Sequence, residues 1–114
     1  LARAHPAAAA NVLRTAELLR EEAEVLDALI AAELAAGNGA GRGRIRLERL
    51  RELHPALRRL VVQQLADSAA GRPVPGAARR AEEVAALSRG GSMLDLGGGV
   101  RAVLERGVVR AERP

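Results

Sequence analysis

The chain has 114 residues, of which 48% are apolar, and it contains no Phe, Tyr, Trp or Cys, so it is one domain or a large part of one, with a core built from Leu, Val, Ile and Ala. The lack of cysteine excludes disulfides and thiolate metal sites. All 18 basic residues are arginine, and there are 14 acidic residues. The sequence has no apolar run of membrane length and no signal-peptide pattern, which predicts a cytoplasmic protein without a membrane partner.

The first predicted element is a long helix over residues 6–36, about 45 Å in length. Pro6 suits the first helical turn, where its missing N–H is not needed, and Gly37 offers a left-handed stop. Apolar residues recur in steps of three or four, which indicates one face of an α-helix. This face comprises Leu13, Ala16, Leu19, Ala23, Leu26, Ile30 and Leu34, and is widened by Leu18, Val25 and Leu29.

A Gly- and Arg-rich segment follows over residues 37–46 and begins GNGAGRG. Four glycines in its first seven residues predict a flexible linker. A phosphate-cradling glycine loop is the alternative, but that motif needs a strand before it and a helix directly after it. This segment instead follows a predicted helix and precedes a basic stretch.

Short helices are predicted within residues 47–90. The first covers residues 47–53, and the second begins at Pro55 and ends before Gly71. The stretch RPVPG over residues 72–76 predicts a turn, because two prolines and a glycine do not extend a helix. A last helix is predicted over residues 77–89, with Gly90 and Gly91 ending it.

The period changes in the tail, residues 91–114. Leu94 and Leu96 alternate with polar neighbours, and turns are expected at residues 97–99 and at Arg106 and Gly107. This pattern predicts a short antiparallel β-hairpin or meander, which must pack on the helices to be stable. The predicted fold is therefore mainly α: a small helical bundle led by one long N-terminal helix, with a short C-terminal hairpin or meander.

No catalytic, metal-binding or cofactor-binding residue is predicted within this chain. His5 and His54 each precede a proline, which favours a role at a helix entrance rather than in a site. Neither has an evident partner at metal-ligand spacing. Adjacent glutamates in a helix point about 100° apart, so Glu82 and Glu83 do not form an acid–base pair.

Arginines gather around the predicted linker, whereas residues 1–36 are acidic. Guanidinium groups neutralise phosphates, and the absence of aromatic rings argues against base stacking. RNA contact would therefore be to backbone and shape. The alternative is that these arginines solvate short helices and pair with the acidic first helix. The candidate RNA-binding residues are Arg42, Arg44, Arg46, Arg49, Arg51, Arg58 and Arg59, with Arg79 and Arg80 as further candidates.

Three stretches, in this order, resemble the helical region that follows the ATP-binding domain of tRNA(Ile)-lysidine synthases. They are LARAHPAAAANVLRTAELLREEAEVLDALI, RLERLRELHPALRRLVVQQL and LDLGGGVRAVLERGVVRAE, and they cover nearly the whole chain. In the first stretch the matching residues are Pro6, Leu13, Arg14, Ala16, Leu19, Arg20, Glu21, Glu22, Leu26 and Asp27.

The resemblance implies an ATP-dependent carbon–nitrogen ligase that adenylates a cytidine of the tRNA anticodon and joins lysine to it. The family's ATP loop, Ser-Gly-Gly-x-Asp-Ser, does not occur in this sequence. The chain would then be the tRNA-binding region, with ATP and the catalytic domain belonging to an upstream part of the protein. A helical protein–protein interaction module is the alternative hypothesis, and a free-standing enzyme is less favoured than either.

Overall fold

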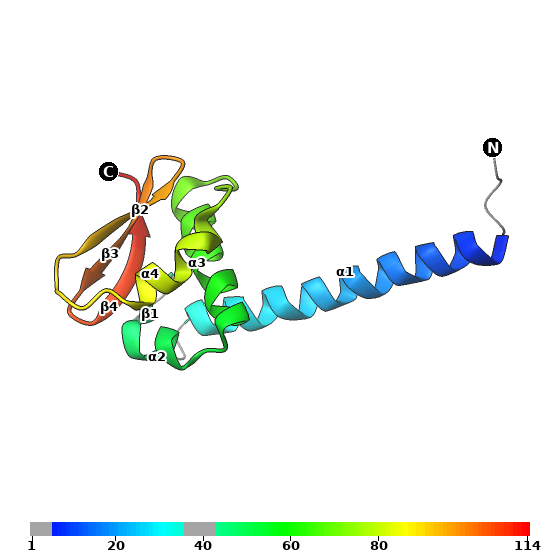
Figure 1. Ribbon diagram of the computed structural model, residues 1–114, viewed down its shortest axis with the longest axis horizontal. Coiled ribbons are helices and arrows are strands. Elements are labelled where there is room, and N and C mark those ends of the chain that lie inside the picture. The colour runs from blue at the N-terminus through cyan, green and yellow to red at the C-terminus, as the bar shows by residue number, and fades with distance from the viewer. Residues whose placement is uncertain (1–5, 36–42) are drawn as a thin grey trace.

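The structure, a computed structural model, describes residues 6–35 and 43–114. It consists of a long N-terminal helix joined to a body, residues 43–114, made of short helices and a four-stranded sheet (Figure 1). This architecture confirms the predicted fold class. Most of the predicted linker and also His5 lie outside the described residues.

The long helix, α1 (Pro6–Ala35), projects away from the body and gives the molecule extents of 59 × 28 × 23 Å (Figure 1). Its length agrees with the prediction to within one residue. Ile30 and Leu34 are buried against the body, whereas every residue from 7 to 29 is exposed. Neither α1 nor any other helix in the described ranges is long and apolar enough to cross a membrane.

Two helices follow, α2 (Leu47–Glu52) and α3 (Pro55–Ala70), close to their predicted ranges. His54 caps α3, because its Nδ1 accepts a hydrogen bond from the backbone N–H of Ala56 at 3.0 Å. This confirms the predicted helix-entrance role of His54. Gly71 ends α3 with a left-handed φ of 71°, and its N–H donates to the Asp67 carbonyl at 2.9 Å.

The predicted helix over residues 77–89 is wrong in both its geometry and its end. It starts as a 3-10 turn, η1 (Ala77–Arg80), and continues as a short α4 (Ala81–Ala85). The chain then leaves the helical path to enter the sheet, and the N–H of Gly91 donates to the Leu104 carbonyl at 2.7 Å. The predicted helix therefore ends four residues early, and the chain pairs with β3 from Gly91 onward.

The tail forms the predicted meander from β2 (Met93–Gly97), β3 (Val100–Glu105) and β4 (Val108–Glu112), all antiparallel. The β3–β4 loop has two residues, and both Arg106 and Gly107 have positive φ, which is characteristic of a type I′ hairpin turn.

A fourth strand, β1 (Ile45–Arg46), was not predicted, because these residues were assigned to the linker. It pairs antiparallel with β4, with Ile45 opposite Val109, so the sheet order is β1-β4-β3-β2. Ile45 and Val109 are both fully buried. This pairing joins the first described strand after α1 to the C-terminal strand of the sheet.

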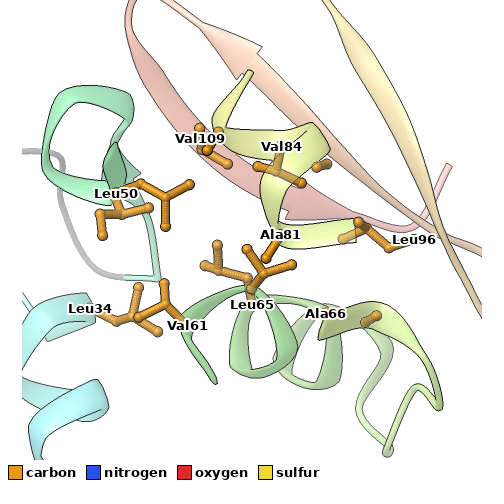
Figure 2. Packing of buried hydrophobic residues seen from close by; sticks show 14 of the residues in the cluster. Leu34, Leu50, Val61, Leu65, Ala66, Ala81, Val84, Leu96 and Val109 are labelled. Atoms are coloured by element: carbon orange, nitrogen blue, oxygen red, sulfur yellow. The ribbon is translucent and has the colours of Figure 1, made fainter. Parts of the chain in front are cut away.

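The core lies between the helices and one face of the sheet, where side chains from α1, α2, α3, α4 and the strands meet (Figure 2). As predicted from composition, the buried side chains are Leu, Val, Ile and Ala, and none of the buried residues is polar or charged in the described part of the chain. The largest fully buried side chains are those of Ile45, Leu50, Val61, Val62, Val74, Val84, Val100 and Val109.

Candidate nucleic-acid interface

The predicted RNA-binding arginines divide into those that join elements of the fold and those that face solvent. Arg42 lies outside the described residues. The first group consists of Arg49, Arg51 and Arg58, and the second of Arg44, Arg46 and Arg59. The prediction treated all of them as equivalent, which the local geometry does not bear out.

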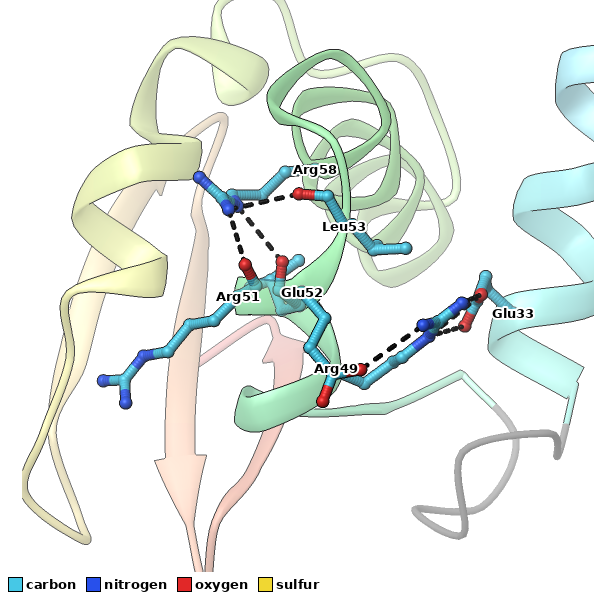
Figure 3. A network of polar contacts seen from close by, with 7 residues as sticks. Glu33, Arg49, Arg51, Glu52, Leu53 and Arg58 are labelled. Carbon is cyan, nitrogen blue, oxygen red and sulfur yellow. Dashed lines mark hydrogen bonds and ion pairs between the residues drawn. The ribbon is translucent and has the colours of Figure 1, made fainter.

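Arg49 joins α2 to the last turns of α1. Its Nε donates to the two carboxylate oxygens of Glu33 at 3.1 and 3.2 Å, and its guanidinium also pairs with Glu52 at 3.5 Å (Figure 3). The hydrogen bond from Arg49 lowers the pKa of Glu33 despite partial burial, and the same bond raises the pKa of Arg49. Arg49 therefore pairs with the acidic first helix, which was the alternative to RNA binding for these arginines.

Arg58 closes the end of the six-residue helix α2 (Figure 3). Its Nε donates to the Leu50 carbonyl at 3.1 Å, and one of its terminal nitrogens donates to the carbonyls of Arg51 and Leu53 at 2.8 and 3.2 Å. The other terminal nitrogen pairs with Glu82 at 2.7 Å. Arg58 therefore satisfies carbonyls that a helix end leaves unpaired, and it links α2, α3 and α4.

Arg51 fastens α2 to α4 in a similar way. Its Nε donates to the Ala85 carbonyl at 2.7 Å, and a terminal nitrogen donates to the Leu87 carbonyl at 2.8 Å. These bonds supply donors to two backbone carbonyls at and just after the end of α4. Arg51 and Arg58 are thus held by the fold.

The remaining arginine candidates of the helical region lie on separate elements. Arg59 of α3 and Arg79 of η1 are exposed, and neither makes a hydrogen bond or ion pair with another described residue. Arg80 pairs with Glu83 at 3.0 Å.

A basic hollow forms where β1 begins and the β3–β4 hairpin turns. Its volume is about 360 Å³, and we call it the hairpin hollow; its lining consists of Arg44, Glu105, Arg106, Val108 and Arg110. Three arginines face one glutamate, so its formal charge is +2. The β1–β4 pairing creates it, because antiparallel alignment of Ile45 with Val109 carries Arg44 toward Arg110.

Two guanidinium groups of the hairpin hollow are available to a ligand. Arg44 and Arg106 are exposed and make no hydrogen bond or ion pair with another described residue. Arg106 also has a φ of 53°, and it is the one non-glycine residue with positive φ in the described ranges. For a residue other than Gly, Asn or Asp this conformation is unfavourable, and such strain is concentrated at functional sites.

Arg110 is held at the rim of the hairpin hollow by two carboxylates. It pairs with Glu112 at 2.6 Å and with Glu105 at 3.6 Å, and Glu112 also accepts a hydrogen bond from Arg101 at 3.1 Å. The bonds from Arg110 and then Arg101 lower the pKa of Glu112, and Glu112 in turn raises the pKa of Arg110. The positive charge of Arg110 is therefore fixed in position.

This arrangement of side chains can bind an anion. Guanidinium groups match the oxygens of phosphate, and two unpaired ones beside a fixed third surround a concave space. No group of acidic or histidine side chains that could hold a metal ion occurs within residues 6–35 and 43–114.

No match was found to any protein family, curated protein or solved structure. The resemblance to lysidine synthases therefore stays a prediction.

Arg106 and Arg110 were missed as candidate binding residues. The turn at Arg106 was predicted, but its arginine was read only as a turn residue. A type I′ turn favours Asn, Asp or Gly at its first central position. The arginine at this position, immediately before Gly107, therefore indicated that the side chain has a function besides forming the turn.

Proposed function

We propose that this chain binds the phosphate backbone of RNA through the hairpin hollow, and that it is the tRNA-binding region of a lysidine-forming ligase. The observation that carries RNA binding is the pair of unpaired guanidinium groups, Arg44 and Arg106, beside the fixed charge of Arg110. The choice of tRNA, and of an ATP-dependent catalytic domain upstream, rests on the sequence resemblance alone.

The distribution of charge supports a polyanionic ligand for the body rather than for α1. Residues 43–114 contain 14 arginines and 8 acidic residues, a formal charge of +6. Residues 7–35 contain two arginines and six acidic residues, a formal charge of −4. A basic body attracts phosphates over a longer range than single contacts do. With no aromatic residue in the chain, recognition would be of backbone and shape.

Replacement of Arg44 and Arg106 together by Ala tests the proposal in a tRNA-binding titration between about 50 and 200 mM salt. We expect binding to weaken by about tenfold or more. Each phosphate contact contributes about 0.9 to the slope of log affinity against log salt, so the slope should fall by about 2. Both side chains are exposed and make no hydrogen bond or ion pair with another described residue, so the fold should be unaffected.

The matched control replaces Arg59 and Arg79 by Ala, which removes the same charge from exposed side chains outside the hairpin hollow. We expect only a small loss of affinity. An equal loss in both double variants would reduce the interaction to general charge attraction, and no tRNA binding at low salt would reject the function. Arg49, Arg51 and Arg58 are unsuitable for this test, because changing them also disturbs the fold.

A protein–protein interaction module is the second candidate function, and one observation favours it. The large apolar side chains of α1 before Ile30 are exposed, and those of Leu13, Leu19 and Val25 are each at least 60% accessible. RNA binding by the body does not explain this surface.

A further inference from the structure

The apolar face of α1 continues out of the core into solvent. Ile30 and Leu34 are 5% and 8% exposed. Leu19 lies on the same face about three turns earlier and is 61% exposed. We call this face the α1 stripe; it consists of Val12, Ala16, Leu19, Ala23, Leu26, Ile30 and Leu34. A helix in water usually owes its stability to an apolar face that is packed, so the exposed part of the stripe requires a covering surface.

The body offers no matching surface. Among its described residues, Met93 is the one large hydrophobic side chain that is exposed. Among the described residues, an apolar counterpart of equal length to the stripe is offered by the α1 of a second copy. Ala16 and Ala23 are small, so two such helices can approach closely at these positions.

The charges of α1 indicate the orientation of such a pair. Residues 7–20 contain Arg14, Arg20 and Glu17, a formal charge of +1. Residues 21–32 contain four acidic residues and no basic one, a charge of −4. Parallel helices would place the two acidic halves side by side, whereas antiparallel helices place each acidic half against a basic one.

A two-fold dimer requires a patch that is complementary to itself, and these two halves meet that condition in the antiparallel arrangement. The exposed residues 7–29 extend about 35 Å from the body, which leaves the two bodies at opposite ends of the pair. We propose that the α1 stripe is a self-association surface, on which the α1 of a second copy of this chain binds antiparallel. The inference does not depend on RNA binding.

The first test is the mass of the chain by analytical ultracentrifugation over a range of concentrations. We expect a dimer, and Leu19→Asn should weaken its association by at least tenfold. Val25→Asn is the matched control, since Val25 is 60% exposed and lies outside the α1 stripe, about 120° around the helix from Leu19, and it should leave association nearly unchanged. Circular dichroism of both variants checks that the helix is retained.

A monomer at all concentrations would overturn the proposal and leave a different protein as the partner of α1. Equal weakening by Leu19→Asn and Val25→Asn would also overturn it, because the α1 stripe would then not be the interface.

A second measurement tests the orientation. The chain has no cysteine, so Ala10→Cys places a single spin label at an exposed position near the start of α1. Antiparallel helices put the two labels about 30 Å apart or more, while parallel helices put them within about 20 Å. The longer distance supports the proposal, and the shorter one contradicts it.

Discussion

Arginine side chains of similar appearance in the sequence differ in their roles. Arg58 lies among backbone carbonyls and is mostly buried, with 13% of its side chain exposed, while its neighbour Arg59 points into solvent. Arg106 occupies a strained turn and has no partner within residues 6–35 and 43–114, while Arg110 is held by two carboxylates. Whether an arginine can bind a ligand is decided by which carbonyls and carboxylates surround it.

Arg58→Ala should destabilise the protein by about 2–4 kcal/mol, because it leaves several carbonyls at the end of α2 without a donor. Arg59→Ala should change stability by no more than about 0.5 kcal/mol, because Arg59 is exposed. Urea unfolding of the two variants measures the difference. If Arg58→Ala were as stable as Arg59→Ala, the linking role of Arg58 would be refuted.

Arg106→Asn should change stability and RNA binding in opposite directions. Asn tolerates a positive φ better than Arg does, so the variant should be more stable by about 0.5–1 kcal/mol. It also removes one charge from the hairpin hollow, so tRNA affinity should fall. Thermal unfolding and tRNA titration of the same sample measure both. A variant that is stabilised but binds tRNA normally would show that Arg106 has no part in binding.

At the scale of elements, the contact of α1 with the body depends on one ion pair to α2 as well as on apolar packing against α3. Glu33 of α1 meets Arg49 of α2, next to the buried Ile30 and Leu34. Every residue of α1 from 7 to 29 is exposed. The orientation of this long helix is therefore set by its last turns.

Acid should weaken this contact. The pKa of Glu33 is lowered in the folded protein by the hydrogen bond from Arg49. Its stabilising contribution is thus complete above the ordinary glutamate pKa of about 4.3 and is lost as pH falls through the lower folded value. NMR signals of residues 30–35 and 47–52 should report the loosening as the pH falls below about 4.3.

Glu33→Gln should remove the Glu33-dependent part of this titration, whereas Glu24→Gln, on the exposed part of α1, should leave it in place. An unchanged titration in Glu33→Gln would assign the transition to other carboxylates.

For the whole molecule, local patterns were sufficient where structure is local. Steps of three and four residues predicted α1, and the glycines near residues 97–99 and at Gly107 predicted the turns of the meander. They were insufficient where distant segments meet. Ile45 pairs with Val109, and nothing in the two residues of β1 indicates a partner so far along the chain. The hairpin hollow depends on that pairing, so Arg44 and Arg110 could not be associated from sequence.

The same limit applies to the predicted arginine cluster, whose role in RNA binding stays a prediction. It included Arg44, which lines the hairpin hollow, but also Arg49, Arg51 and Arg58, whose partners come from α1, α2 and α4. Density of charge along a sequence does not reveal which guanidinium groups are already occupied.

The sheet order has a consequence for how the protein is made. β4, the last strand to be synthesised, lies between β1 and β3, and it carries the fully buried Val109. Until residue 112 leaves the ribosome, Ile45 lacks its neighbour and the inner surfaces of the helices remain uncovered. The body therefore closes only after β4 has been synthesised, and a polypeptide that still lacks β4 is a natural client for chaperones that shield nonpolar segments.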